Sequence, residues 1–68
     1  MTPTDTIKAE YDDAVARAWD NLARYKFSNF GYWSSRVVFL GQLLEKVGDK
    51  RPANPFASLV KVAREAGQ

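Results

Sequence analysis

Apolar side chains recur at helical spacing along the first third of this chain, and that spacing restricts the folds open to it. They fall within an arc of about 100° when successive residues are turned by 100°, as expected for one face of an α-helix. The sequence Thr2-Pro3-Thr4-Asp5 supplies a capping hydroxyl, a proline for the first helical position and a carboxylate for the first turn. We therefore predict a helix over about residues 3–27, with an apolar face of Ile7, Tyr11, Ala14, Val15, Ala18, Leu22 and Tyr25.

A second amphipathic segment follows after a short interruption. Ser28, Asn29 and Gly31 offer capping and turn chemistry, so we predict a break near residues 27–33. Beyond it, a helix over about residues 30–47 accounts for the next apolar face, and Gly48 lies where a left-handed C-terminal cap is expected. This second apolar face consists of Phe30, Trp33, Val37, Leu40, Leu44 and Val47.

The C-terminal segment predicts a third, shorter helix over about residues 55–66. Asn54-Pro55 repeats the pattern of a capping side chain followed by proline. The chain lacks the alternating runs and the Asn-Gly or Gly-Gly turns of a β-hairpin. We therefore expect residues 1–68 to form one all-α domain, a small three-helix bundle in which two longer helices make an antiparallel hairpin beside a short C-terminal helix.

The predicted core follows from these faces. Apolar residues of the second helix should meet those of the first, with the third helix closing the core. We expect Trp33, Val37, Leu40 and Leu44 to contact Tyr11, Val15, Ala18 and Leu22, and Phe56, Leu59 and Val60 to cover them.

The short length raises a question of stability. A chain of 68 residues removes only about 60% of its unfolded surface from water, so native domains of this size usually need an added device. The sequence contains no cysteine and no histidine, which excludes disulfides, thiolate–zinc sites and the commonest general base. Dense aromatic packing or self-association therefore remains as the source of added stability. Residues 24–40 hold six of the nine aromatic side chains.

Catalytic signatures are weak. Ser34 and Ser35 have no motif around them and are better explained by helix structure. Glu10 and Asp13 share a helix face but lack a ligand loop, and the glycines are too scattered to form a phosphate loop. We expect no enzyme activity, no metal, no cofactor and no small-molecule substrate.

Two binding hypotheses remain. The first is a protein interface, because several aromatic and apolar residues and one arginine do not fit the predicted core, and Tyr, Trp and Arg dominate interface hot spots. Its candidates are Phe27, Tyr32, Arg36, Val38 and Phe39. The partner would be another protein or a second copy of this chain.

The second hypothesis is weak nucleic-acid binding by the more basic C-terminal half. Its candidate phosphate contacts are Lys46, Lys50, Arg51, Lys61 and Arg64. The predicted connector before the third helix is longer than a helix-turn-helix turn, and that helix offers few side chains for reading base edges. We therefore favour the protein interface.

The expected location is cytoplasmic. The start, MTPTDTIKAEYDD, is polar and acidic where a signal peptide would be basic and then apolar, and no run is long enough to span a membrane. The RYKF and FGYW segments between residues 24 and 33 resemble small bacterial or prophage-encoded proteins. That resemblance implies no activity and no role for any residue.

Overall fold

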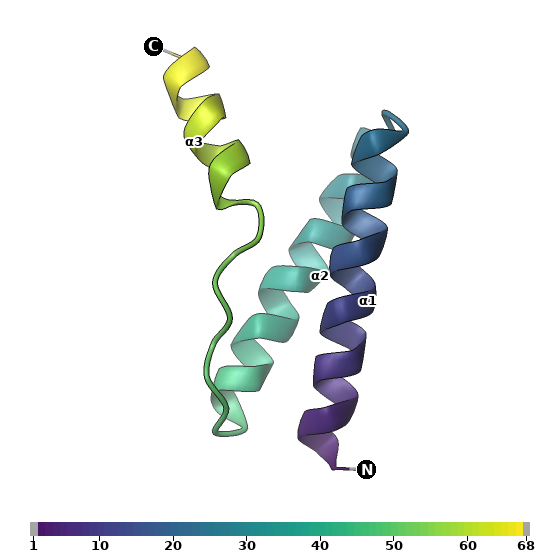
Figure 1. Ribbon diagram of the computed structural model, residues 1–68, viewed down its shortest axis with the longest axis vertical. Coiled ribbons are helices and arrows are strands. Elements are labelled where there is room, and N and C mark those ends of the chain that lie inside the picture. Colours follow the sequence, from purple (N-terminus) through teal and green to yellow (C-terminus); the bar gives the residue numbers. More distant parts are fainter. Residues whose placement is uncertain (1, 68) are drawn as a thin grey trace.

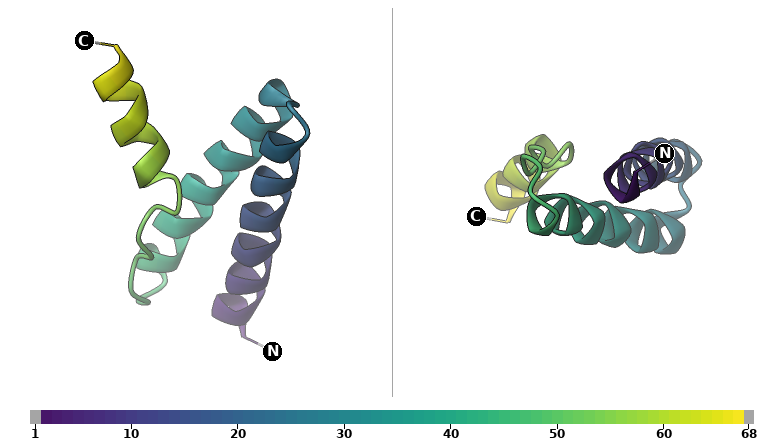
Figure 2. Two further views of the ribbon diagram at one scale, coloured as in Figure 1. Left: turned by 45° about the horizontal axis from the view of Figure 1, so that its top comes forward. Right: turned by 90° about the horizontal axis from the view of Figure 1, so that it is seen from below.

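The computed structural model describes residues 2–67 and contains three helices, α1 (Pro3–Ala23), α2 (Phe27–Lys46) and α3 (Ala57–Ala66). Helices α1 and α2 pack together as an antiparallel hairpin (Figure 1). The connector between α2 and α3 turns back along α2, and α3 then diverges from the hairpin (Figure 2). The predicted all-α fold, with a hairpin of two longer helices and a short C-terminal helix, is confirmed.

Helix α1 begins with the predicted cap. The Thr2 hydroxyl accepts a hydrogen bond from the Asp5 amide at 3.2 Å, and the Asp5 carboxylate accepts one from the Thr2 amide at 3.3 Å. This capping box satisfies backbone donors that the helix itself leaves free, and Pro3 loses nothing at the first helical position. The start of the chain's first helix was therefore predictable from four residues.

Helix α1 ends four residues before its predicted end. Tyr25 adopts a left-handed conformation with φ 61°, and its amide donates to the Leu22 carbonyl at 3.1 Å. The Lys26 amide donates to the Asn21 carbonyl at 2.9 Å, which completes a Schellman motif. The break therefore lies at residues 24–26 and not at 27–33, because the chain turns at a tyrosine although better turn formers follow it.

Helix α2 ends in the same motif, here at the predicted glycine. Gly48 has φ 92°, and the Asp49 amide donates to the Leu44 carbonyl at 2.9 Å. Because glycine has no Cβ, this left-handed position is free of the steric cost that Tyr25 bears. The two long helices thus share one termination geometry with different residues.

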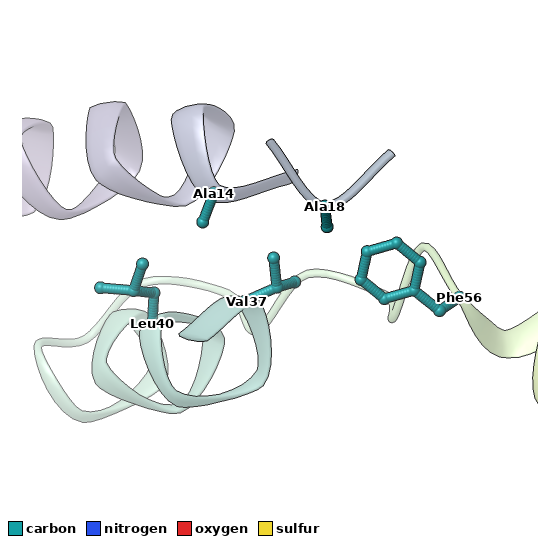
Figure 3. Packing of buried hydrophobic residues seen from close by; sticks show 5 residues of the cluster. All are labelled: Ala14, Ala18, Val37, Leu40 and Phe56. Atoms are coloured by element: carbon teal, nitrogen blue, oxygen red, sulfur yellow. The ribbon is translucent and has the colours of Figure 1, made fainter. Parts of the chain in front are cut away.

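The hairpin core is a narrow seam in which small side chains of α1 meet larger side chains of α2. Ala14 and Ala18 of α1 face Val37 and Leu40 of α2, and all four are buried (Figure 3). Alanine on one side lets the helix backbones approach closely and leaves little room for large side chains between them. Partly buried residues line the seam, namely Ile7, Tyr11, Val15, Phe30, Trp33 and Leu43.

Most of the predicted core is present, but its closure by α3 is wrong. Phe56 is only 5% exposed, as predicted, whereas Leu59 and Val60 are 36% and 44% exposed. The reason is that α3 points away from the hairpin and itself contains no buried residue. Asn54 accepts a hydrogen bond from the Phe56 amide at 2.9 Å, so a turn comes first and the helix starts at Ala57, two residues later than predicted.

Candidate interaction surfaces

Large apolar side chains lie on three separate exposed surfaces of this molecule. The first, the hairpin tip, consists of Tyr25 and Phe27. The second, the outer stripe of α2, consists of Tyr32, Arg36 and Phe39. The third, the α2–α3 groove, is an open depression with a volume of about 220 Å³, lined by Phe30, Ser34, Val38, Asn54, Phe56, Leu59 and Val60.

The hairpin tip presents two aromatic rings to solvent. Tyr25 is 81% exposed, and its ring lies edge-on to that of Phe27 with centroids 6.1 Å apart. Phe27 is the first residue of α2, whereas the sequence prediction placed it at the end of the first helix. The tip therefore combines strained backbone with exposed aromatic surface.

The outer stripe lies away from the seam. Tyr32, Arg36 and Phe39 are spaced four and three residues apart, which places them on one side of α2. The Tyr32 ring meets the ring of Trp33 edge-on at 5.1 Å, and the Arg36 Cζ atom lies 5.9 Å from the same ring centroid. Two of the three outer-stripe residues are thus in contact with Trp33 of the same helix.

Val38 does not belong to the outer stripe. One residue corresponds to a turn of about 100° around a helix, so Val38 and Phe39 point in clearly different directions. Val38 lines the groove toward α3, and it also borders a smaller depression with Tyr11, Gly41 and Arg51. The structure therefore divides the predicted interface residues among the tip, the stripe and the groove.

The predicted basic residues are all exposed but do not gather on one face. Lys46 and Lys50 flank the turn at the end of α2, and Arg51 follows in the connector. Lys61 and Arg64 belong to α3, which extends toward the opposite end of the molecule (Figure 1). The positive charges are thus split into two groups.

An ion pair closes the open end of the hairpin. The Lys8 Nζ atom lies 3.0 Å from the Asp49 Oδ2 atom. The hydrogen bond from Lys8 holds the pKa of Asp49 below its ordinary value of 3.8, and the same bond raises the pKa of Lys8 above 10.5. Sequence reasoning missed this pair, because the two residues lie on different elements.

Trp19 is the most important residue that the sequence interpretation left unassigned. Its ring lies 5.0 Å from that of Phe56, and Phe56 in turn meets Phe30 edge-on at 5.3 Å. Phe56 is therefore held between α1 and α2 and anchors the connector to the hairpin. The available signal was a large aromatic residue at the edge of the apolar face of α1.

In the described part of the chain, the serine hydroxyls and acidic side chains have structural roles or stand apart from one another. The hydroxyls of Ser34 and Ser35 both donate to the Gly31 carbonyl, at 3.1 and 2.9 Å, which is ordinary helix chemistry. Within residues 2–67, acidic side chains do not cluster in a way that could hold a metal ion. None of the three described helices combines the length and the apolar character needed to cross a membrane.

The molecule is more open than a compact chain of its mass. Its accessible surface is 5062 Å², whereas a compact monomer of 7.7 kDa exposes about 4,300 Å². Its radius of gyration is 13.2 Å, against about 11 Å expected for this length. The additional surface comes with the divergence of α3 (Figure 2).

No family model, no curated protein and no solved structure matches this chain. Its function must therefore be argued from its own surfaces.

Proposed function

We propose that this chain is a small, non-catalytic protein-interaction module that binds another protein or a second copy of itself. The observation that carries the proposal is the amount of large apolar side chain left outside a narrow core, on the tip, the outer stripe and the groove. Monomeric proteins keep few large apolar patches on their surface, and such patches commonly mark binding sites.

The residue types also support an interface. Tyrosine and arginine are enriched among residues that dominate binding energy, and the outer stripe contains one of each beside a phenylalanine. The Arg36 Cζ atom lies 5.9 Å from the Trp33 ring centroid, so the stripe places a cation beside aromatic rings. A surface of this composition supports binding to another protein.

The experiment that tests the proposal is affinity capture with the immobilised chain. Tyr32→Asp combined with Phe39→Asp places two charges on the outer stripe, seven residues apart. Ala9→Asp combined with Ala16→Asp places two charges at the same spacing on the exposed side of α1 and serves as the matched control. Bound proteins, including the chain itself, are identified by mass spectrometry.

We expect the wild-type chain and the α1 control to retain the same protein and the stripe variant or a groove variant, Val38→Asp, to lose it. Retention that is equal in all four chains, or absent in all four, contradicts the proposal. The alternative function predicts instead that labelled DNA or RNA binds at low salt through Lys46, Lys50, Arg51, Lys61 and Arg64 and is released steeply as salt rises. Fluorescence anisotropy with the wild-type chain measures this directly.

A further inference from the structure

Helix α3 has an apolar face but packs on almost nothing in its own chain. It contains 10 residues and no buried one, and Leu59, Val60 and Val62 are exposed. Isolated helices shorter than about 12–15 residues are marginal in water, and most helices in proteins depend on tertiary packing. The contact with the hairpin nearest to α3 is made by Phe56, which precedes the helix. Helix α3 therefore needs a further surface.

The α2–α3 groove has the shape and chemistry of such a surface. Phe30, Ser34 and Val38 form its wall on α2, and Leu59 and Val60 form its wall on α3. All the residues that line it are uncharged, so it favours an apolar helix over a charged segment. The apolar face of α3 has that character.

The surface area indicates how large the occupant is. The chain exposes roughly 700 Å² more than a compact monomer of its mass. A typical stable interface buries about 800 Å² on each partner. The additional exposed area is therefore close to the area that each subunit buries in a typical dimer.

We propose that the occupant is a second copy of this chain, related by a two-fold axis, with Leu59 and Val60 of each copy packed in the α2–α3 groove of the other. The inference rests on the proposed function and names its partner. A two-fold interface requires one surface that is complementary to itself. The groove meets that requirement, because the apolar face of α3 is one of its own walls. Association then covers Val38, Leu59 and Val60 together and leaves the outer stripe free.

The test is the molar mass of the full chain over a wide concentration range, by sedimentation equilibrium. The wild-type chain should reach twice 7.7 kDa. Val60→Asp should raise the dimer dissociation constant at least about tenfold, which corresponds to 1.4 kcal/mol. Ser58→Asp adds the same charge on the polar side of α3 and should leave the dimer intact. Because Val60→Asp can also unfold α3, Val38→Asp supplies a second disruption on the other wall, with helicity checked by circular dichroism.

The outcomes separate this inference from the proposed function. A wild-type chain that stays monomeric at all concentrations overturns the dimer, while capture of a different protein still supports an interaction module. A dimer that survives Val38→Asp but is lost in Tyr32→Asp combined with Phe39→Asp overturns the groove and moves the interface to the outer stripe. Co-sedimentation of the wild-type chain with anionic phospholipid vesicles, lost in Lys61→Glu combined with Arg64→Glu, overturns it too, because a membrane surface would then cover α3.

Discussion

Phe56 packs its ring 5.0 Å from the ring of Trp19, and this contact joins the C-terminal part of the chain to the hairpin. Phe56 is nearly fully buried although the helix that follows it is exposed throughout. A single aromatic side chain thus determines where α3 begins to diverge.

Phe56→Ala should therefore destabilise the fold far more than removal of an exposed ring. Truncating a buried phenylalanine costs about 3–5 kcal/mol, because the transfer energy is lost and a cavity remains. Phe39→Ala removes the same ring from the exposed outer stripe and should cost less than about 1 kcal/mol. Urea unfolding of dilute protein, followed by circular dichroism, compares the two. Equal losses would show that Phe56 is not the anchor described here.

Ala18→Leu should separate the two long helices. Ala18 is completely buried in the seam opposite α2, so extra methyl groups cannot be accommodated without a backbone shift. Overpacking of this kind costs about 1–3 kcal/mol. Ala16→Leu makes the same change on the exposed side of α1 and should alter the free energy of unfolding by less than about 0.5 kcal/mol. Thermal and urea denaturation of both variants provide the comparison, and a neutral Ala18→Leu would contradict the seam.

Tyr25→Gly should stabilise the chain relative to Tyr25→Ala by about 1 kcal/mol. Both substitutions remove the ring and its contact with Phe27, but only glycine adopts φ 61° without a steric cost. The reverse change at the other helix end, Gly48→Ala, should lose a similar amount. Matched urea titrations of the three variants test the Schellman geometry at both ends. If the Ala variant at residue 25 is the more stable one, the left-handed turn is wrong.

Gly41→Ala should stabilise α2 by about 0.5–1 kcal/mol, the usual advantage of alanine over glycine inside a helix. A Cβ atom at Gly41 would lie 3.7 Å from the Pro52 Cγ atom, an ordinary contact distance. Gly31→Ala meets nothing within 4 Å and should gain a similar amount, so it serves as the control. Gly41→Leu, in contrast, should displace the connector and lose stability. If Gly31→Ala raises the free energy of unfolding and Gly41→Ala lowers it, the connector lies closer to α2 than described here.

The Lys8–Asp49 pair should make stability depend on pH at both extremes. The pKa of Asp49 is lowered in the folded chain, so its contribution is present above the ordinary carboxyl pKa of 3.8 and is lost as pH falls through the lowered value. The pKa of Lys8 is raised, so its contribution is full below 10.5 and is lost as pH rises through the raised value.

Unfolding free energies measured across pH for the wild-type chain, Asp49→Asn and Lys8→Gln test this dependence. The difference between the wild-type chain and each variant should shrink at both ends of the range. Glu10→Gln removes an exposed carboxylate from the same helix and should leave that pattern unchanged. The Lys8 side chain is exposed and that of Asp49 is only half-buried, so the effect should be small and should decrease with salt.

Sequence periodicity was sufficient to predict the three helices and the buried sides of α1 and α2. The capping box at Thr2 and the glycine at position 48 fixed two helix ends, because those residue types have few other roles in such contexts. The end of α1 was not predictable in the same way. A left-handed tyrosine is unfavourable locally, and only the packing of the whole hairpin selects it.

The interaction surfaces were only partly predictable, for a different reason. A helical wheel shows that α3 is amphipathic but does not show what covers its apolar face, so Leu59 and Val60 were assigned to a core that they do not enter. The wheel also separates Val38 from Phe39. The sequence interpretation nevertheless placed both in one interface, because neither residue fitted the predicted core. Trp19 was missed because its partner, Phe56, lies far away in the sequence.

The alanine seam has a consequence for the distribution of hydrophobic mass in this protein. Ala14 and Ala18 contribute little side-chain volume to the interior, so the large rings other than Phe56 lie at the margins of the seam or on the surface. A chain built in this way removes less apolar surface from water by folding alone, and the proposed dimer would remove more of it. Its thermal stability should then rise with its own concentration, as it does for proteins whose folding is completed by association.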